Sequence, residues 1–372
     1  MTRKCCAWFM AGLSGITFLM IMASLIWGSR LRDASQTEDR YIFKEIIRVD
    51  LEEPRFAFKG MRKIQEMDVG ARGEILLTDG WRAFLVDNQG TSLHLIGRNG
   101  QGPGEYEMVS SLRIMNDGKI FLFDPVGSKC IFYNQDGAYV RERRIIEVPT
   151  FSVLALDNGF FLVLRRVENR DDTTTVFYSI YNDRLNHVCD LEPRYSFDKP
   201  TKKFKYNGMG YAIGYILRPG HIDIASNAED DFHLYRYTET GLRERAIEFE
   251  VKRAKTSPAY RQDQENRLKK VFGQSNWLSG VMKNLYFPKY FPVFKWFGRL
   301  ETDDLVIELY EGRPQEHDSV LQIVDSAGRP QGSLSLPAAQ FRRLIKNRIY
   351  SAYEKDSGYL CLRGYLIERR VP

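Results

Sequence analysis

The sequence predicts an all-β fold, a six-bladed β-propeller in which about six four-stranded sheets close into a ring. Three observations lead to this prediction. Short β-rich runs follow one another along the chain with turn residues between them. Similar turns, Asp87–Gly90 and Asn134–Gly137, recur after about 47 residues, which is a period typical of propeller blades. The last unit ends one strand short, while a strand near the start has no partner.

The first element is an apolar segment. Residues 7–28 contain no charged side chain, and their number is about that which a membrane-spanning helix requires. Arg3 and Lys4 precede the segment, which places the amino terminus in the cytoplasm and the body of the chain on the extracytoplasmic side, periplasmic or extracellular. The alternative is a cleaved signal peptide, which would release a secreted protein. We expect a transmembrane anchor within residues 1–28 and a linker over residues 29–40.

The body of the chain, residues 41–372, is expected to form the propeller. Tyr41–Leu51 reads as a strand without an obvious partner beside it. From Met61 onward, six successive units follow, each built from short strand-like runs. The sixth unit ends with a strand around Tyr359–Glu368 and lacks a fourth strand. We therefore predict that Tyr41–Leu51 pairs with this last strand, which leaves no exposed edge between the first and last sheets.

One insert interrupts the repeated units at about residues 257–273. Ser257 suits the N-cap position of a helix, and Pro258 suits its first turn. We expect a helix between the fourth and fifth units. The aromatic-rich segment that follows, residues 277–297, could stack on a sugar or rest on a membrane, but we favour the interpretation that it covers the helix and fills the fifth unit, because large rings dominate protein cores.

A glycine-rich loop, GRNGQGPGEY, occupies residues 97–106 between the first and second units. Its glycines and Pro103 permit a tight reversal of the chain. The loop lacks the Lys-Ser/Thr pair of a phosphate-binding loop, and residues 110–115 after it read as a strand where a dinucleotide-binding loop would open a helix. We interpret the loop as a structural connector in which Glu105 binds backbone N–H groups.

This loop, followed by SLRIMNDGKIFLFD and KCIFYNQDGAYV, resembles the six-bladed β-propeller proteins related to NHL repeats, which are common among exported and lipid-anchored bacterial proteins. The end of the chain, RIYSAYE and YLCLRGYLIER, is similar to the closing blade of that family. The resemblance covers roughly residues 41–370 and implies the fold. It implies no reaction, because most members have no assigned activity and the lyases and lactonases on similar propellers are related by fold alone.

Charge and cysteine usage exclude some classes of function. The formal net charge is +6, and Arg3 and Lys4 lie before the apolar segment, so the excess in the rest of the chain is too small and dispersed for a nucleic-acid-binding protein. Cys130, Cys189 and Cys361 have no metal-binding spacing, and we expect them to pack as buried apolar side chains in preference to forming a disulfide. The five histidines are scattered as well. We predict no catalytic residue, no metal ligand and no cofactor.

The candidate binding face follows from the strand order. The loops that join one unit to the next, and those that join the second and third strands of a unit, fall at the same end of the ring, which we call the long-loop end. Ligands bind where long loops gather over a scaffold. The candidate ligand-binding residues at this end are Arg98, Asn99, Glu105, Arg165, Arg166, Lys202 and Lys203.

A basic rim is expected from the arginines and lysines of two of these loops: Arg165, Arg166, Arg170, Lys202, Lys203 and Lys205. An ordinary solvated surface is the alternative, because Asp171, Asp172 and Asp198 neutralise part of the charge. A rim that is used would bind an anionic partner, such as an acidic protein surface, an anionic glycan or lipid headgroups, and salt would weaken the binding.

Two functions are open at this point. The first is a membrane-anchored binding or scaffolding module for a protein, peptide or glycan. The alternative is a hydrolase or lyase with a metal in the central channel of the propeller. The residues themselves do not name a substrate.

Overall fold

The computed structural model describes most of the chain from Tyr41 onward. The described residues are 41–50, 64–145, 150–171, 173–198, 206–207, 213–227, 232–249, 251, 253–272, 282–283, 285–310, 319–339, 341–354 and 360–369. The predicted anchor, residues 7–28, and the linker after it lie outside this range. No helix among the described residues has the length and apolar character needed to cross a membrane.

The first three sheets are antiparallel and take their strands in chain order. The first sheet contains β2 (Glu66–Val69), β3 (Ile75–Thr78), β4 (Ala83–Val86) and β5 (Leu93–Ile96). The second contains β8 (Ser111–Ile114), β9 (Ile120–Asp124), β10 (Lys129–Tyr133) and β11 (Tyr139–Arg144). The third contains β12 (Thr150–Ala155), β13 (Phe161–Glu168), β14 (Thr173–Tyr181) and β15 (His187–Asp190), and β16 (Tyr195–Asp198) also pairs with β14. The predicted units of this half are therefore confirmed.

The fourth and fifth sheets repeat the same order. The fourth contains β18 (Ile213–Arg218), β19 (His221–Ser226), β20 (Phe232–Thr238) and β21 (Arg243–Phe249). The fifth contains β23 (Trp296–Arg299), β24 (Leu305–Glu308), β25 (Ser319–Val324) and β26 (Pro330–Leu336). Two short parallel pairs lie outside the six sheets: β6 (Arg98–Asn99) with β7 (Glu105–Tyr106), and β17 (Tyr206–Asn207) with β22 (Leu285–Tyr286).

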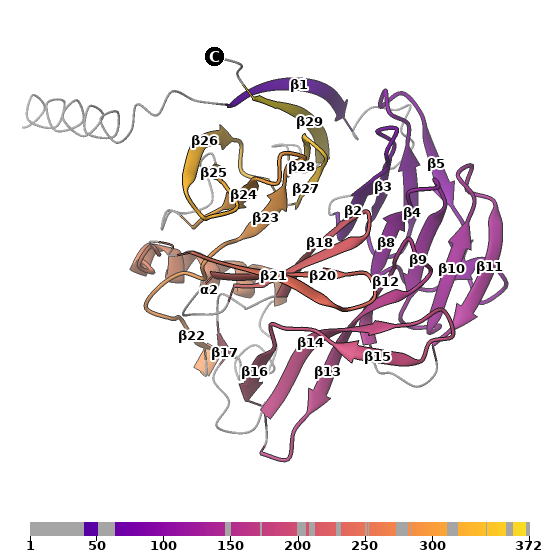
Figure 1. Cartoon of the computed structure of the whole chain (residues 1–372), viewed down its shortest axis with the longest axis horizontal. Coiled ribbons are helices and arrows are strands. Elements are labelled where there is room, and N and C mark those ends of the chain that lie inside the picture. The colour runs from indigo at the N-terminus through magenta and orange to yellow at the C-terminus, as the bar shows by residue number, and fades with distance from the viewer. Residues whose placement is uncertain are drawn as a thin grey trace, which may run out of the picture.

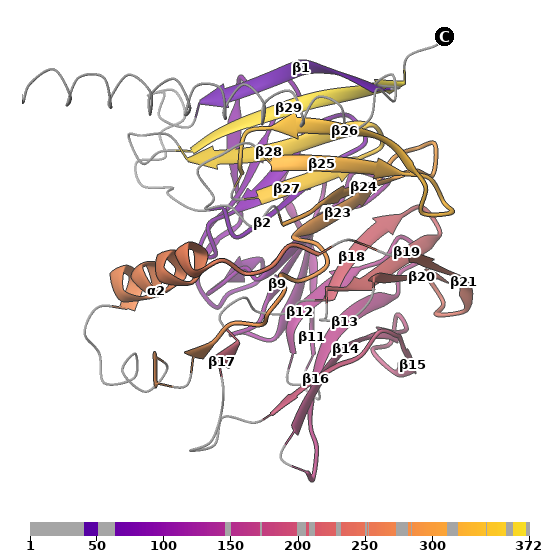
Figure 2. The same ribbon diagram turned by 90° about the vertical axis from the view of Figure 1, so that its left-hand side faces the viewer.

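The sixth sheet closes the ring. It contains β27 (Phe341–Ile345), β28 (Arg348–Glu354) and β29 (Leu360–Arg369), and its outer strand is β1 (Tyr41–Asp50). β1 runs antiparallel to β29, with Tyr41 opposite Arg369 and Asp50 opposite Cys361. The indigo β1 lies beside the yellow β29 in both views (Figures 1 and 2). The predicted pairing of the first and last strands is thus confirmed.

The hydrophobic core lies between neighbouring sheets. One cluster joins Val69 of the first sheet to Leu362 of the sixth and includes Val49 of β1, which is fully buried. Another joins Leu162 of the third sheet to Ile224 of the fourth. Within the ring, β2 contacts both β8 and β27, and β23 contacts both β18 and β27. Each sheet is therefore covered by its neighbours, and the first strands of the sheets line the centre.

The predicted helix is present as α2 (Pro258–Phe272). Ser257 is its N-cap, because the Ser257 hydroxyl accepts a hydrogen bond from the backbone N–H of Tyr260 at 3.1 Å. The ring of Tyr260 packs edge-on against Phe291 at 4.7 Å between centroids, and Phe291 is buried. Figure 2 shows α2 to one side of the sheets. Part of the aromatic segment after the helix therefore covers it, as expected.

Candidate functional site

The glycine-rich loop uses its polar groups to hold its own shape. The Glu105 carboxylate accepts hydrogen bonds from the Gly102 backbone N–H at 2.9 Å and from Arg98 Nε at 2.5 Å. The Gly102 N–H and Arg98 together lower the pKa of Glu105. The third predicted residue of the loop, Asn99, donates from Nδ2 to the Glu107 carbonyl at 3.3 Å. All three side chains therefore bind within the same stretch of chain.

Side chains from the second sheet hold this loop in place. Lys129 Nζ donates to the carbonyls of Gln101, Gly102 and Glu105 at 2.9, 3.3 and 3.2 Å. The Tyr133 hydroxyl donates to the Gly104 carbonyl at 2.8 Å. These contacts join two sheets and make the loop a structural connector.

Two of the basic residues predicted for the rim lie along a long hairpin. The sequence predicts Arg165 and Arg166 in the loop between the second and third strands of their unit, but both belong to strand β13, opposite Phe177 and Val176 of β14. The prediction ended the strand too early, because the hairpin continues beyond the fourth strand of its sheet, where β16 takes over the pairing with β14. Arg165 lies 3.6 Å from the Asp190 carboxylate, and Arg166 lies 3.7 Å from Glu168.

Arg170 is exposed in the turn after β13, and the three predicted rim lysines, Lys202, Lys203 and Lys205, lie outside the described residues. Neither the three loop residues nor the two hairpin arginines line either of the cavities described below. Their role in binding stays a prediction.

Cys130 and Cys361 are free and buried, and Cys189 is free and half-buried. In the part of the chain that the structure describes, His, Cys, Asp and Glu side chains do not gather in a group of three or more that could hold a metal ion.

Two cavities lie at the centre of the ring, one toward each end. The larger, of about 520 Å³, is at the long-loop end, where β2, β18 and β23 begin. The smaller, of about 280 Å³, is at the opposite end, which we call the hairpin end because the turns that join the first strand of a sheet to the second, and the third to the fourth, lie there. Ile216, Leu217, Arg343, Leu344 and Ile345 line both cavities. These five residues therefore separate two compartments of one central channel.

The larger cavity has walls from four sheets and from α2. Glu66 comes from the start of β2, Tyr215 from β18, and Trp296 from the start of β23. The helix contributes Tyr260 and Gln264. Strand starts and helix meet here because the chain enters each sheet from the long-loop end.

One wall of the larger cavity carries a cationic group of side chains. Arg342, on β27, donates from Nε to the Glu308 carboxylate at 2.8 Å, and Lys295 Nζ lies 3.7 Å from the same carboxylate. Lys295 also lies over the ring of Tyr310, 5.3 Å from its centroid. Two cations therefore share one carboxylate on this wall, which leaves an excess of one positive charge.

An acidic pair lies opposite, across the boundary between the two cavities. Glu66 and Asp68 are two positions apart on β2, so both lie on the same face of that strand, where Glu66 lines the larger cavity and Asp68 the smaller one. Arg343 Nε lies 3.2 Å from the Asp68 carboxylate, and its guanidinium lies over the ring of Tyr215. Burial raises the pKa of Glu66 to about 7, with Arg343 opposing that shift and Asp68 adding to it. One guanidinium thus faces two carboxyl groups.

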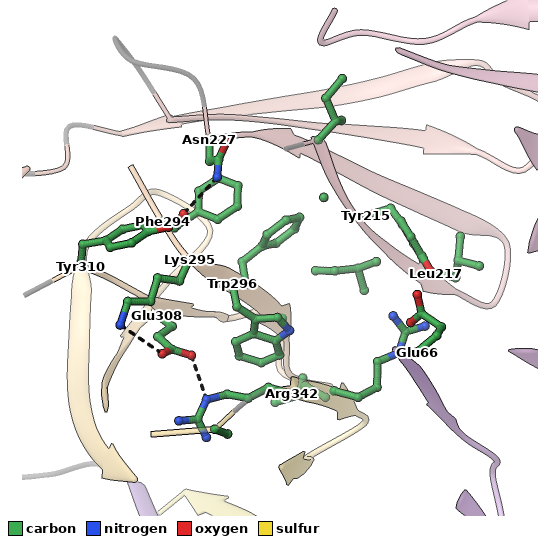
Figure 3. A pocket seen from close by; sticks show the side chains of 18 of the residues that line it. Glu66, Tyr215, Leu217, Asn227, Phe294, Lys295, Trp296, Glu308, Tyr310 and Arg342 are labelled. Carbon is green, nitrogen blue, oxygen red and sulfur yellow. Dashed lines mark hydrogen bonds and ion pairs between the residues drawn. The ribbon is translucent and has the colours of Figure 1, made fainter. Parts of the chain in front are cut away.

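Trp296 lies between the two walls. Figure 3 shows its indole in the middle of the cavity, with Glu308, Lys295 and Arg342 on one side and Glu66 and Tyr215 on the other. The indole is half-buried, so part of the ring remains accessible from the cavity. A cavity that pairs aromatic surface with a few polar groups is typical of sites for small organic ligands.

Arginines at and beside the smaller cavity lie close to carboxylate groups. Arg299, whose side chain is fully buried, places Nε 2.6 Å from the Asp223 carboxylate, and Arg236 places its own Nε 2.9 Å from the same group. Arg218 lies 2.7 Å from Asp303. Burial opposes the shift, but hydrogen bonds and charge from the arginines lower the pKa of Asp303 to about 2.

Comparison with known proteins agrees with the six-bladed propeller fold. The family model DUF5128, described as a 6-bladed beta-propeller, matches residues 55–205. The chain is a six-bladed β-propeller. No curated protein matches it.

Solved structures share the propeller fold at low sequence identity. A candidate exported protein from Bacteroides fragilis NCTC 9343 is 15% identical, with a TM-score of 0.52 over 91% of this chain and 98% of that one. A DUF4221 family member from Bacteroides vulgatus ATCC 8482 is 10% identical, with a TM-score of 0.50 over 90% of this chain and 100% of the other. At these identities the likeness concerns the fold alone.

The residues that line the propeller's larger cavity were missed at the sequence level. Glu66, Trp296 and Arg343 belong to three different sheets, and only ring closure brings them together. One signal was available: the innermost strands of the blades, such as EMDV and FRRLI, carry charged residues among apolar ones. A charged side chain on such a strand requires either a charged or polar partner or access to the channel, because burial of an unpaired charge is costly.

Proposed function

We propose that this propeller is an extracytoplasmic binding module whose larger channel cavity holds a small organic ligand or the end of a peptide or glycan chain. One observation carries the proposal: the cavity at the long-loop end contains an accessible indole, Trp296, between two groups of opposite charge. Aromatic surface provides contact area, and a few polar groups around it provide orientation. The rest of the ring supports this arrangement as a rigid scaffold.

A ligand screen on the full-length chain, purified in a mild detergent, tests the proposal. The screen compares melting temperatures with short peptides, saccharides and organic acids, because a ligand that binds only the native state raises the unfolding temperature. We expect at least one of these classes to stabilise the wild-type protein and to have no effect on Trp296→Ala.

Trp81→Ala is the matched control. Trp81 is 64% exposed, lies between β3 and β4 at the same end of the ring, and does not line the cavity. Its substitution should leave the stabilisation intact. Ligand stabilisation that persists in Trp296→Ala, or that disappears in Trp81→Ala, contradicts the proposed site.

We also propose that residues 7–28 keep the propeller at the membrane. The support is the uncharged segment of about membrane-spanning length, with Arg3 and Lys4 before it. Mass spectrometry of the mature protein should find an intact amino terminus. A new terminus between Ala23 and Arg30 would instead demonstrate a cleaved signal peptide.

A further inference from the structure

The charges around the larger cavity deepen the proposed function, on which this inference rests, by indicating the class of ligand. On one wall the Arg342 donors already have acceptors. Its side chain is 2% exposed and donates to Glu308 at 2.8 Å, to the Ser351 hydroxyl at 2.9 Å and to the Pro337 carbonyl at 2.8 Å. Arg342 is therefore part of the wall and has little capacity for a ligand.

Lys295 is the available cation on that wall. Its side chain is 27% exposed, and the 3.7 Å between Nζ and the Glu308 carboxylate is too long for a good hydrogen bond. Because Glu308 is already bonded to Arg342, the charge of Lys295 is only partly compensated. An anionic group of a ligand would supply the missing acceptor.

Glu66 is the available carboxyl on the opposite wall. The Asp68 carboxylate pairs with Arg343 and also accepts a hydrogen bond from the Ile114 backbone N–H at 2.9 Å. Within the described part of the chain, no Lys, Arg or His nitrogen lies within 4.0 Å of the Glu66 carboxylate. A cationic group of a ligand would therefore be paired here.

We propose that the larger cavity binds a short peptide with free ends, its α-ammonium group at Glu66, its carboxylate at Lys295, and an apolar side chain against Trp296. The two charges lie on opposite walls with the indole between them, so the ligand carries its charges at its two ends (Figure 3). A free amino acid holds both charges on one carbon. A neutral or uronic glycan lacks the cation, and an amino sugar lacks the acid.

The protonation of Glu66 makes this binding depend on pH. Its carboxyl faces Asp68 on its own strand, Arg343 on β27, and the phenols of Tyr215 on β18 and Tyr178 on β14. With a pKa of about 7, Glu66 loses its charge as the pH falls below neutrality. The α-amino group of a peptide loses its own charge above about pH 8. Affinity should therefore be greatest between these values and should weaken on both sides.

Calorimetric titration of the full-length chain at pH 7.5 tests the inference with three probes: the tripeptide Ala-Phe-Ala, its N-acetyl derivative and its C-terminal amide. We expect each cap to weaken binding about tenfold or more, because each removes one charged contact. Glu66→Gln should abolish the preference for the free amino end, and Lys295→Gln the preference for the free carboxyl end. Glu368→Gln, an exposed change on β29, should preserve both preferences.

The outcomes separate this inference from the proposed function. Equal affinity for the free and capped peptides overturns the inference and needs no variant for its interpretation. Binding of a saccharide that depends on Trp296, with no binding of the tripeptide, also overturns it but preserves the proposed cavity. If no ligand of any class binds in a manner that depends on Trp296, the proposed function itself fails.

Discussion

The two ends of the central channel use the same kinds of side chain in opposite ways. At the hairpin end, Arg299 and Arg236 both pair with the buried Asp223 carboxylate. At the long-loop end, Glu66 has no cation within 4.0 Å among the described residues, and Lys295 has only a distant, shared partner. Buried charges that lie close to opposite charges have little capacity for a ligand, whereas charges without a close partner can be satisfied by one. This difference is the reason that we propose binding at the long-loop end.

The largest effect is expected at the hairpin end. Asp223→Ala would leave the fully buried Arg299 without its closest carboxylate, and breaking one partner from a buried ion pair costs about 3–5 kcal/mol. Urea unfolding monitored by circular dichroism measures the change. A loss of unfolding free energy below about 1 kcal/mol would show that the buried pair contributes little to stability, which would weaken the contrast between the two ends of the channel.

A change of opposite sign is expected at the long-loop end. The folded-state pKa of Glu66, about 7, is above its unfolded value, so the protonated form is favoured by folding and stability is lost as the pH rises toward 7. Glu66→Gln should remove this loss and raise the free energy of unfolding at pH 8 by up to about 3 kcal/mol, with little change at pH 4.5. Unfolding curves at several pH values test this, and a destabilised variant at pH 8 would contradict it.

At the hairpin end the dependence of stability on pH should be the reverse of that at Glu66, with stability lost as the pH falls. The lowered pKa of Asp303 means that its contribution is present above the unfolded pKa of about 4 and is lost as the pH falls toward 2. Because Asp303 is 35% exposed, solvent screening limits this contribution to about 1 kcal/mol. Asp303→Asn should flatten the acid limb of the stability curve. An unchanged acid limb would mean that other carboxylates dominate it.

The smallest effect on stability is expected from the basic hairpin. Arg165 and Arg166 are partly exposed, and exposed ion pairs contribute little to folding. Reversing both to Glu should leave the melting temperature nearly unchanged and should weaken the capture of an anionic partner, such as anionic lipid vesicles, at low salt. Capture that is equal in the variant and the wild-type protein, and equal at low and high salt, would identify this hairpin as ordinary surface.

Much of the fold could be predicted because its signals are local. Turns such as Asp87–Gly90 need a glycine at positive φ, and Gly90 has a φ of 68°. The pairing of β1 with β29 also followed from counting strands. The full extent of strand β13 was not predictable, since Arg165 and Arg166 are charged, partly exposed residues and do not continue the apolar pattern that marks a strand.

The site was harder to predict than the fold. The glycine-rich loop is easy to recognise in the sequence because its backbone angles require glycine. Its Glu105 carboxylate, however, is hydrogen-bonded within the loop. The cavity residues Glu66, Lys295 and Trp296 show no pattern of their own along the chain. The glycine-rich motif therefore indicated the backbone geometry of a loop. The residues of the larger cavity come from strands that meet only in the closed ring, so no local motif marks them.

A crystal structure of the protein grown with Ala-Phe-Ala would locate the bound peptide and so test the larger cavity as the binding site. We expect density for the peptide against the indole of Trp296, with its amino end toward Glu66 and its carboxylate toward Lys295. Peptide density in the smaller cavity or on the outer surface, with the larger cavity empty, would rule out the larger cavity as the site.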